Sequence, residues 1–124
     1  MPTQMLSNIY PKRGEIYLTD LDPGFGREIH KKRPVLIVST NALNKTLPTV
    51  IVIPYSSIIP QFVGYDVVVF LSQKGLDKKS ALIVNQVRSV DKVRLGKKIG
   101  RVSKLKLAEV EDSLKVILGI IESN

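Results

Sequence analysis

Two continuous apolar runs decide the fold: Pro34–Ser39 reads PVLIVS, and Thr49–Tyr55 reads TVIVIPY. Both have the length of a strand and are rich in β-branched residues, without alternating polar positions, which is typical of strands buried on both faces. Pro34 is the first residue of its run, where a strand tolerates proline. The polar segment Asn41–Lys45 between them predicts a tight turn or a single turn of helix. We therefore expect two buried strands that form the core of the domain.

Segments on either side of these runs predict further strands, at Gly14–Leu21, Tyr65–Leu71, Ser80–Val90 and Val93–Val102. In the first of these, Ile16 and Leu18 alternate with the polar residues Glu15 and Thr19, as expected for a half-buried strand. Turn-forming residues separate the segments. Altogether the pattern predicts five or six short strands.

After residue 102 the apolar period changes to that of a helix. Ser103 is a good N-cap. The apolar stripe that follows consists of Leu107, Val110, Leu114, Ile117, Leu118 and Ile121, and we expect the charged face opposite it to be solvated. Short strands followed by one helix predict a mainly β fold, a small, partly open barrel with the C-terminal helix packed on it. Residues 1–12 are expected to be a tail, and 13–124 a single domain.

Composition narrows the function. The chain of 124 residues has no cysteine and one histidine, which excludes disulfides, thiolate metal sites and histidine-rich zinc sites. No segment has the pattern of a signal peptide or the length of a membrane span, so we expect a cytoplasmic protein without a membrane partner. The net charge of +8 favours a polyanionic partner such as nucleic acid, although many small soluble domains carry similar charge.

A basic loop, Gly24–Arg33, is the strongest candidate for a functional site. It contains one carboxylate, one imidazole and four cations, namely Glu28, His30, Arg27, Lys31, Lys32 and Arg33. Metal-free cleavage of RNA needs a group that accepts the 2′-hydroxyl proton and a donor to the non-bridging phosphate oxygens. A carboxylate can do the first and a guanidinium the second. Glu28 and Arg33 offer both groups, although they could instead pair only with each other on a solvated loop.

Six short motifs follow one another along the chain, and their order and spacing can be compared with those of known families. They are Arg13–Tyr17 with Asp20–Pro23, Gly26–Glu28 with Arg33–Ile37, Thr49–Val52 with Ser56–Ser57, Gly75–Leu76 with Ser80–Ile83, Gln86–Leu95, and Ile99–Ser103. The most specific is QVRSVDKVRL, at Gln86–Leu95. In order and spacing, over roughly residues 12–121, these segments resemble the MazF/PemK family of type II toxins.

This resemblance implies an SH3-like barrel of the CcdB/PemK type that forms a homodimer. It implies a sequence-specific endoribonuclease, without metal or other cofactor, that cuts single-stranded mRNA to 2′,3′-cyclic phosphate and 5′-hydroxyl ends and so inhibits translation and growth. It also implies a cognate antitoxin that covers the RNA groove, with DNA contacted only indirectly through that antitoxin.

The family's catalytic arginine before proline falls on Arg33, its loop carboxylate on Glu28 and its strand-end threonine on Ser56, which keeps the hydroxyl. Seven further residues are expected to bind RNA: Arg27, His30, Lys31, Lys32, Ser57, Asn85 and Gln86. The family usually has an acidic residue at the position of Asn85, so the cleavage motif stays open. The choice of Glu28 or His30 as general base stays open too.

Two other functions are possible for the same barrel. CcdB-like gyrase poisons are not enzymes and act through the end of the C-terminal helix, but the ending Ile120–Asn124 lacks the aromatic tip associated with them. A catalytically inactive RNA-binding barrel is the second alternative. Incubation of total RNA with the protein in EDTA would separate all three.

Overall fold

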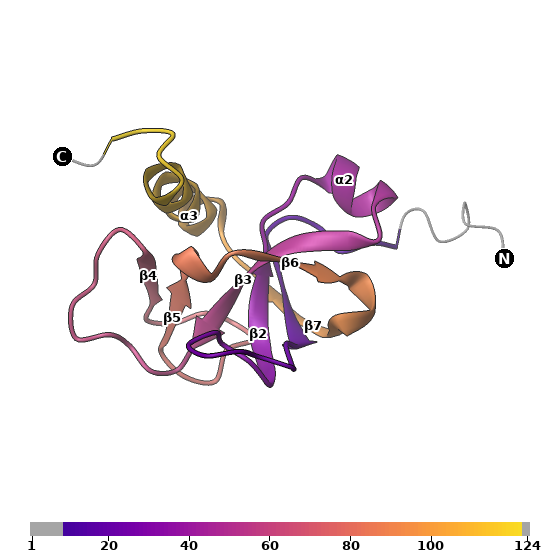
Figure 1. Cartoon of the computed structure of the whole chain (residues 1–124), viewed down its shortest axis with the longest axis horizontal. Coiled ribbons are helices and arrows are strands. Elements are labelled where there is room, and N and C mark those ends of the chain that lie inside the picture. The colour runs from indigo at the N-terminus through magenta and orange to yellow at the C-terminus, as the bar shows by residue number, and fades with distance from the viewer. Residues whose placement is uncertain (1–8, 123–124) are drawn as a thin grey trace, which may run out of the picture.

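The computed structural model describes residues 9–122, and within them a curled antiparallel sheet carries a single long helix on one side (Figure 1). Its strands are β1 (Glu15–Asp20), β2 (Lys32–Ile37), β3 (Thr49–Ser56), β4 (Val67–Phe70), β5 (Ser80–Ile83), β6 (Arg88–Asp91) and β7 (Leu95–Arg101). The helical segments are α2 (Asn41–Thr46), η1 (Val84–Gln86), η2 (Lys92–Arg94) and α3 (Lys104–Ile117). The predicted mainly β fold with a C-terminal helix is confirmed, with seven strands where five or six were expected.

The sheet is partly open, as predicted. Its strands follow the order β4-β5-β3-β2-β1-β7, while β6 pairs with β3 outside this path. Strand β3 connects two parts of the sheet, because its first half pairs with β6 and its last two residues pair with β5. The two apolar runs are therefore central, and Val35, Leu36 and Ile37 of β2 are completely buried. In β3, Ile51 is the exception, with 41% of its surface exposed.

Two apolar clusters lie on opposite faces of the sheet. The larger contains Ile16, Leu36, Ile53, Tyr55 and Phe70 and is covered by α3, while the smaller contains Leu21, Val35, Ile37, Val50 and Val52. Because the sheet buries both faces, its strands need not alternate between polar and apolar residues.

The alternation predicted for β1 is wrong for this reason. Glu15 and Thr19 are buried, whereas Leu18 is 38% exposed. Glu15 is accommodated because the Lys98 ammonium lies 3.0 Å from its Oε2 and the Lys12 backbone N–H donates to its Oε1 at 2.7 Å. Paired in this way, a carboxylate can be buried in a strand that would otherwise exclude it.

The single strand predicted over Ser80–Val90 is also wrong. The chain makes the 3₁₀ turn η1 between β5 and β6, and the Val87 N–H donates to the Val84 carbonyl at 3.1 Å. The reason lies in the pairing with β3. Leu82 lies opposite Tyr55 and Arg88 opposite Val52, so the chain needs extra residues to pass from one part of β3 to the next. The turn absorbs them and places Val84 in the core.

Other boundaries differ by a few residues. Strand β7 begins at Leu95 because η2 precedes it, capped by the Asp91 carboxylate, which accepts from the Val93 N–H at 3.0 Å. Strand β2 ends at Ile37 and β4 spans only Val67–Phe70. The short polar segment after β2 is the helical turn α2, as one of the two expected alternatives.

The C-terminal helix α3 begins where predicted, because the Ser103 hydroxyl accepts from the Lys106 N–H at 3.1 Å. Val110 is buried, and Leu107, Leu114 and Ile117 pack against the larger cluster. The predicted stripe is too long, since Leu118 and Ile121 lie beyond the helix and are exposed.

The charged face of α3 is not wholly solvated, contrary to expectation. The Lys106 ammonium donates to the Val69 carbonyl of β4 at 2.9 Å, and Glu111 pairs with Arg13 at 2.6 Å. These contacts tie the helix to the edge strand β4 and to the segment just before β1. No helix between residues 9 and 122 is long and apolar enough to cross a membrane.

Most of the predicted tail, residues 1–8, lies outside the described residues. Lys12, at its end, is tied to β1 through the hydrogen bond with Glu15.

Candidate functional site

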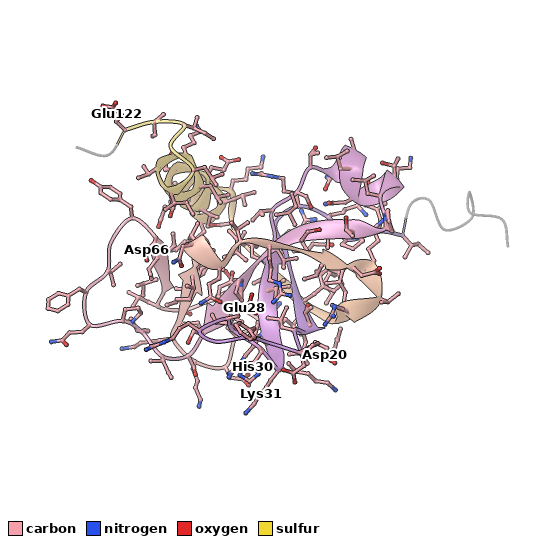
Figure 2. All side chains as sticks on the ribbon, in the orientation of Figure 1. Asp20, Glu28, His30, Lys31, Asp66 and Glu122 are labelled. Atoms are coloured by element: carbon pink, nitrogen blue, oxygen red, sulfur yellow. The ribbon has the colours of Figure 1, made fainter. Side chains whose placement is uncertain are left out.

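The loop between β1 and β2 carries most of the predicted site residues and is closed at its base by Asp22. The Asp22 Oδ1 accepts from the Lys31 backbone N–H at 2.9 Å and lies 3.0 Å from the His30 Nδ1. The Lys31 hydrogen bond, and after it the His30 contact, hold the pKa of Asp22 below its usual value. Gly24 lets His30 approach, because a Cβ at this position would lie 2.4 Å from the His30 Cβ. The contact between His30 and Asp22 therefore holds the two arms of the loop together. Figure 2 labels His30, Lys31 and Glu28 of this loop.

Glu28 stabilises a turn within this loop. Its Oε1 accepts from the Phe25 N–H at 2.8 Å, while its own backbone N–H donates to the Phe25 carbonyl at 3.1 Å. The side chain is exposed, and its second oxygen has no partner among residues 9–122. That oxygen is free to accept a proton or a hydrogen bond from a ligand.

Gln86 fastens the same loop to η1. Its Oε1 accepts from the Ile29 N–H at 2.6 Å, and its Nε2 donates to the Arg27 carbonyl at 3.3 Å. The carbonyl oxygen and one N–H of this amide thus bond to the loop backbone, and its second N–H has no partner among residues 9–122. Asn85, the other predicted base contact, is exposed, and its amide has no partner in the described part of the chain.

Two depressions, each of about 440 Å³, together contain six of the ten predicted site residues, while Ser56, His30, Lys31 and Lys32 line neither. We call the first the Glu28 depression; it is lined by Arg27, Glu28, Asn85, Gln86, Val87 and Arg88. The second, the Arg33 depression, is lined by Leu18, Arg33, Pro34, Tyr55, Ser57, Gly75, Leu76, Asp77, Lys78, Ser80 and Ile99. Glu28 and Arg33 line different depressions and form no ion pair within residues 9–122. The alternative in which they neutralise each other is therefore absent from this structure.

Arg33 is held by one edge of its guanidinium. The Arg33 Nε donates to the His30 carbonyl at 3.2 Å. In the backbone register, Arg33 of β2 lies opposite Thr19 of β1. The two terminal nitrogens have no partner among the described residues, so they can form a bidentate contact with a phosphate. Lys31 and Lys32, just before it, are exposed and belong to no ion pair in the described chain.

Ser56 and Ser57 differ in their surroundings. The half-buried Ser56 hydroxyl oxygen accepts from the Ile58 N–H at 3.1 Å, and Ser56 lines neither depression. Ser57 is exposed and lines the Arg33 depression. The Ser56 hydroxyl keeps its proton available for donation, because it acts only as an acceptor in its bond to Ile58.

Among the lining residues that the sequence did not predict, two carry buried polar atoms that are unsatisfied within residues 9–122. Arg88 lies in the Glu28 depression and Tyr55 in the Arg33 depression. The Arg88 Nη1 and the Tyr55 Oη are buried without a hydrogen-bond partner in the described residues. The available signals were weak: Arg88 follows Gln86 by two positions, and Tyr55 directly precedes Ser56. The described residues contain no group of three or more histidine or acidic side chains placed to bind a metal ion.

Comparisons with known proteins agree with this architecture. Residues 12–118 match the family model of PemK-like, MazF-like toxins of type II toxin–antitoxin systems. The chain is 36% identical to an endoribonuclease MazF from Staphylococcus epidermidis over 110 residues. This matched region covers 88% of this chain and 92% of that relative.

Two solved structures show the same fold. MazF from Deinococcus radiodurans superposes with a TM-score of 0.79 at 23% identity, over 89% of this chain and 97% of that one. A mycobacterial endoribonuclease in complex with its cognate antitoxin superposes with a TM-score of 0.75 at 23% identity, over 91% and 99% of the respective chains. The chain therefore belongs to the PemK-like, MazF-like family of type II toxins.

Proposed function

We propose that this MazF/PemK endoribonuclease cuts single-stranded RNA at specific sequences without a metal ion, leaving a 2′,3′-cyclic phosphate and a 5′-hydroxyl. The observation that carries the proposal is Arg33, whose guanidinium is fixed through Nε and keeps its two terminal nitrogens free. The 36% identical relative is an endoribonuclease. The charge of +8 and the unpaired Lys31 and Lys32 suit a polyanionic strand.

In the proposed reaction the 2′-hydroxyl loses its proton and its oxygen attacks the adjacent phosphorus. The bond to the 5′-oxygen breaks, and that oxygen takes up a proton. Arg33 stabilises the negative charge on the non-bridging oxygens, and Ser56 donates a further hydrogen bond. Glu28 is our candidate for the base, because its second carboxylate oxygen has no partner among residues 9–122. His30 contacts Asp22 only through Nδ1 and keeps Nε2 open within the described part of the chain, so it is the alternative base.

The division into two depressions constrains how RNA lies. Glu28 and Arg33 must act on one nucleotide, so the RNA strand has to pass from one depression to the other. Arg27, Lys31 and Lys32 lie on the basic loop and would neutralise neighbouring phosphates. Asn85 lines the Glu28 depression with an amide that has no partner among residues 9–122, and it is our candidate for reading a base edge there. Gln86 holds the loop through its carbonyl oxygen and one N–H, and its second N–H could still donate to a base.

We further propose that the protein works as a homodimer in the cytoplasm and inhibits translation and growth by cutting mRNA. A cognate antitoxin would cover the RNA-binding surface, and DNA would be contacted only through that antitoxin. A structural neighbour was solved with its own cognate antitoxin, which supports an antitoxin partner.

The test is incubation of total RNA with the purified protein in excess EDTA. Wild type should release fragments whose 5′ ends accept phosphate from polynucleotide kinase without prior dephosphorylation. Arg33→Ala should lose roughly 10²-fold or more in rate, by analogy with the loss of one oxyanion donor. Arg33→Lys should also be poor, because an ammonium cannot form the planar bidentate contact.

Arg101→Ala is the matched control, since Arg101 is exposed and lines neither depression. It should cleave like wild type. Full activity of Arg33→Ala, or strict dependence on added magnesium, would contradict the mechanism. No cleavage by wild type would favour an inactive RNA-binding barrel or, if DNA gyrase is inhibited, a gyrase poison.

A further inference from the structure

We propose that the Arg33 depression binds a single nucleobase beside the cleaved phosphate, and that the Tyr55 hydroxyl hydrogen-bonds to the polar edge of that base. This inference rests on the proposed function and adds to it a specificity-determining residue. The family resemblance did not point to Tyr55.

The first observation is an unsatisfied polar atom. Tyr55 is 1% exposed, yet its hydroxyl oxygen is one of two buried side-chain atoms without a partner in residues 9–122. Buried hydroxyls are nearly always hydrogen-bonded, because leaving one unpaired costs the water contacts that it has lost. Tyr55 also forms part of the lining of the Arg33 depression. Its hydroxyl oxygen itself has almost no exposed surface, so a base in the depression must displace the side chains that cover this oxygen before it can supply the missing bond.

The second observation is that Tyr55 cannot easily turn to find another partner. Its ring packs edge to face against Phe70, with centroids 5.1 Å apart and planes at 78°. Its backbone is held in β3 opposite Leu82 of β5. Burial also raises the pKa of the Tyr55 phenol, so the hydroxyl stays protonated at neutral pH and can donate. The ring is therefore held in place before any ligand arrives, and the side chains that cover the hydroxyl, rather than Tyr55 itself, must move to admit a base.

The third observation is the chemistry of the walls. The apolar side chains of Leu18, Leu76 and Ile99 share the lining with the polar residues Arg33, Ser57 and Asp77. A nucleobase has this same combination, with flat faces that pack on apolar groups and an edge that forms hydrogen bonds. Proteins that recognise single-stranded RNA commonly insert unstacked bases into such sites.

The position of Arg33 explains why the bound base should neighbour the cleaved phosphate. Arg33 lines the same depression, and its terminal nitrogens are free. A base and the phosphate of its own nucleotide are separated only by the ribose. With the phosphate on Arg33, the attached base can therefore enter the depression and reach the Tyr55 hydroxyl once the covering side chains have moved.

The experiment compares wild type with Tyr55→Phe, which removes only the hydroxyl and keeps the ring on Phe70. The matched control is Tyr17→Phe. Burial, together with Glu15, raises the pKa of Tyr17 to about 12, so its phenol, like that of Tyr55, is protonated at neutral pH. Unlike Tyr55, Tyr17 lines neither depression. Each protein is given a pool of RNAs with random bases around the cut, and the cut ends are sequenced. Binding of the four nucleoside 3′-monophosphates is measured in parallel by calorimetry.

Wild type should prefer certain bases at one position next to the cut. In Tyr55→Phe this preference should flatten and kcat/KM for the preferred RNA should fall roughly 3- to 10-fold, as expected for one hydrogen bond. Preferences at other positions should persist. The melting temperature should stay the same or rise, because the variant loses an unsatisfied buried hydroxyl. Tyr17→Phe should keep the wild-type preference at every position.

If wild type cleaves and Tyr55→Phe has an unchanged motif and rate, the base site is refuted while the proposed function stands. A large fall in melting temperature would show that the hydroxyl has a structural partner, which also refutes the proposal. If wild type does not cleave, the proposed function fails, and the monophosphates decide about the base site. Base-dependent binding that is lost in Tyr55→Phe would support the site, and equal binding by both proteins would overturn it.

Discussion

At the scale of single residues, the adjacent hydroxyls at the end of β3 have different surroundings. Ser56 is half-buried and accepts a hydrogen bond from the Ile58 N–H, whereas Ser57 is exposed and lines the Arg33 depression. The family resemblance assigns the catalytic hydroxyl to Ser56. The bond to Ile58 offers a structural role for the same atom, so the two roles must be separated by mutation.

We predict that Ser56→Thr keeps activity, because the hydroxyl remains, and that Ser56→Ala loses it roughly 10-fold or more while the protein still folds. The measurement is the single-turnover cleavage rate of an RNA oligonucleotide, with circular dichroism to check the fold. Ser57→Ala serves as the comparison. A fully active Ser56→Ala would mean that this hydroxyl only caps the local backbone, and loss of activity in Ser57→Ala alone would move the role to Ser57.

At the scale of elements, strands β1 and β7 are linked by ion pairs of the buried Glu15 carboxylate. Besides the contact with Lys98, the Glu15 carboxylate lies 3.7 Å from the Arg101 guanidinium. Burial by itself raises the pKa of Glu15. The Lys12 backbone N–H and the Lys98 hydrogen bond and charge outweigh it, so the pKa lies below its usual value of 4.5.

Because the folded state lowers the pKa of Glu15, ionised Glu15 stabilises the fold above about pH 4.5, and this contribution is lost as pH falls through the folded pKa. Glu15→Gln should therefore lower the free energy of unfolding at pH 7 and differ less from wild type near pH 3. Urea unfolding at both pH values measures this. Glu109→Gln is the control, because Glu109 pairs with Lys106 on the exposed surface, where such pairs contribute little. An equal penalty for Glu15→Gln at both pH values would contradict the assignment.

The wall of the Arg33 depression depends on a second element contact, between the loop at Gly75 and β7. Gly75 has φ +99°, and an added Cβ would lie 2.0 Å from the Ile99 carbonyl oxygen. Both the backbone conformation and the close approach require glycine. The loop that carries Leu76, Asp77 and Lys78 is thereby held beside the depression.

We predict that Gly75→Ala lowers the melting temperature and impairs cleavage, because the loop must move away from Ile99. Gly119→Ala is a matched control, since Gly119 has φ +72° but nothing within 4 Å of its added Cβ. It should cost only the left-handed conformation, roughly 1–2 kcal/mol, and leave the cleavage rate unchanged. Equal destabilisation by both variants, with normal cleavage, would show that the approach to Ile99 does not shape the site.

At the scale of the whole molecule, the chain has a net charge of +8, and its basic side chains differ in whether they form ion pairs within the fold. Arg13, Lys98, Arg101 and Lys106 take part in ion pairs within the fold. Lys31 and Lys32 on the basic loop belong to no ion pair among residues 9–122, so their charge is available to a ligand.

Replacing Lys31 and Lys32 together by alanine should weaken binding of all RNA sequences alike and flatten the salt dependence. Single-strand binding falls with salt with a slope near −0.7 per neutralised phosphate, so we expect a change of roughly one unit. Binding isotherms at several salt concentrations measure it, with a non-cleavable RNA. The cleavage motif should not move, because phosphate contacts carry no sequence information.

The control is a double variant of Lys104 and Lys115, two exposed lysines of α3, which changes the net charge by the same amount. If both double variants flatten the slope equally, the loop lysines act only through net charge. An altered cleavage motif in the loop variant would show that the loop reads sequence.

The sequence by itself determined the elements whose signals are local. The buried strands β2 and β3 and the capped start of α3 could be recognised because continuous apolar runs and an N-cap serine have their effect wherever the chain places them. Arg33 and Glu28 were identified as site candidates from chemistry and resemblance. The family followed from the order of short segments, which needs no coordinates.

Only the tertiary structure decided the features that depend on partners far along the chain. Glu15 is buried because β7 brings Lys98 to it, and η1 interrupts the predicted strand because β3 pairs with two separate segments. The hydrogen-bonded amide of Gln86 and the unpaired hydroxyl of Tyr55 have the same origin. Burial and hydrogen-bond satisfaction are properties of the curled sheet as a whole, with a core on each face, and no local pattern of residues encodes them.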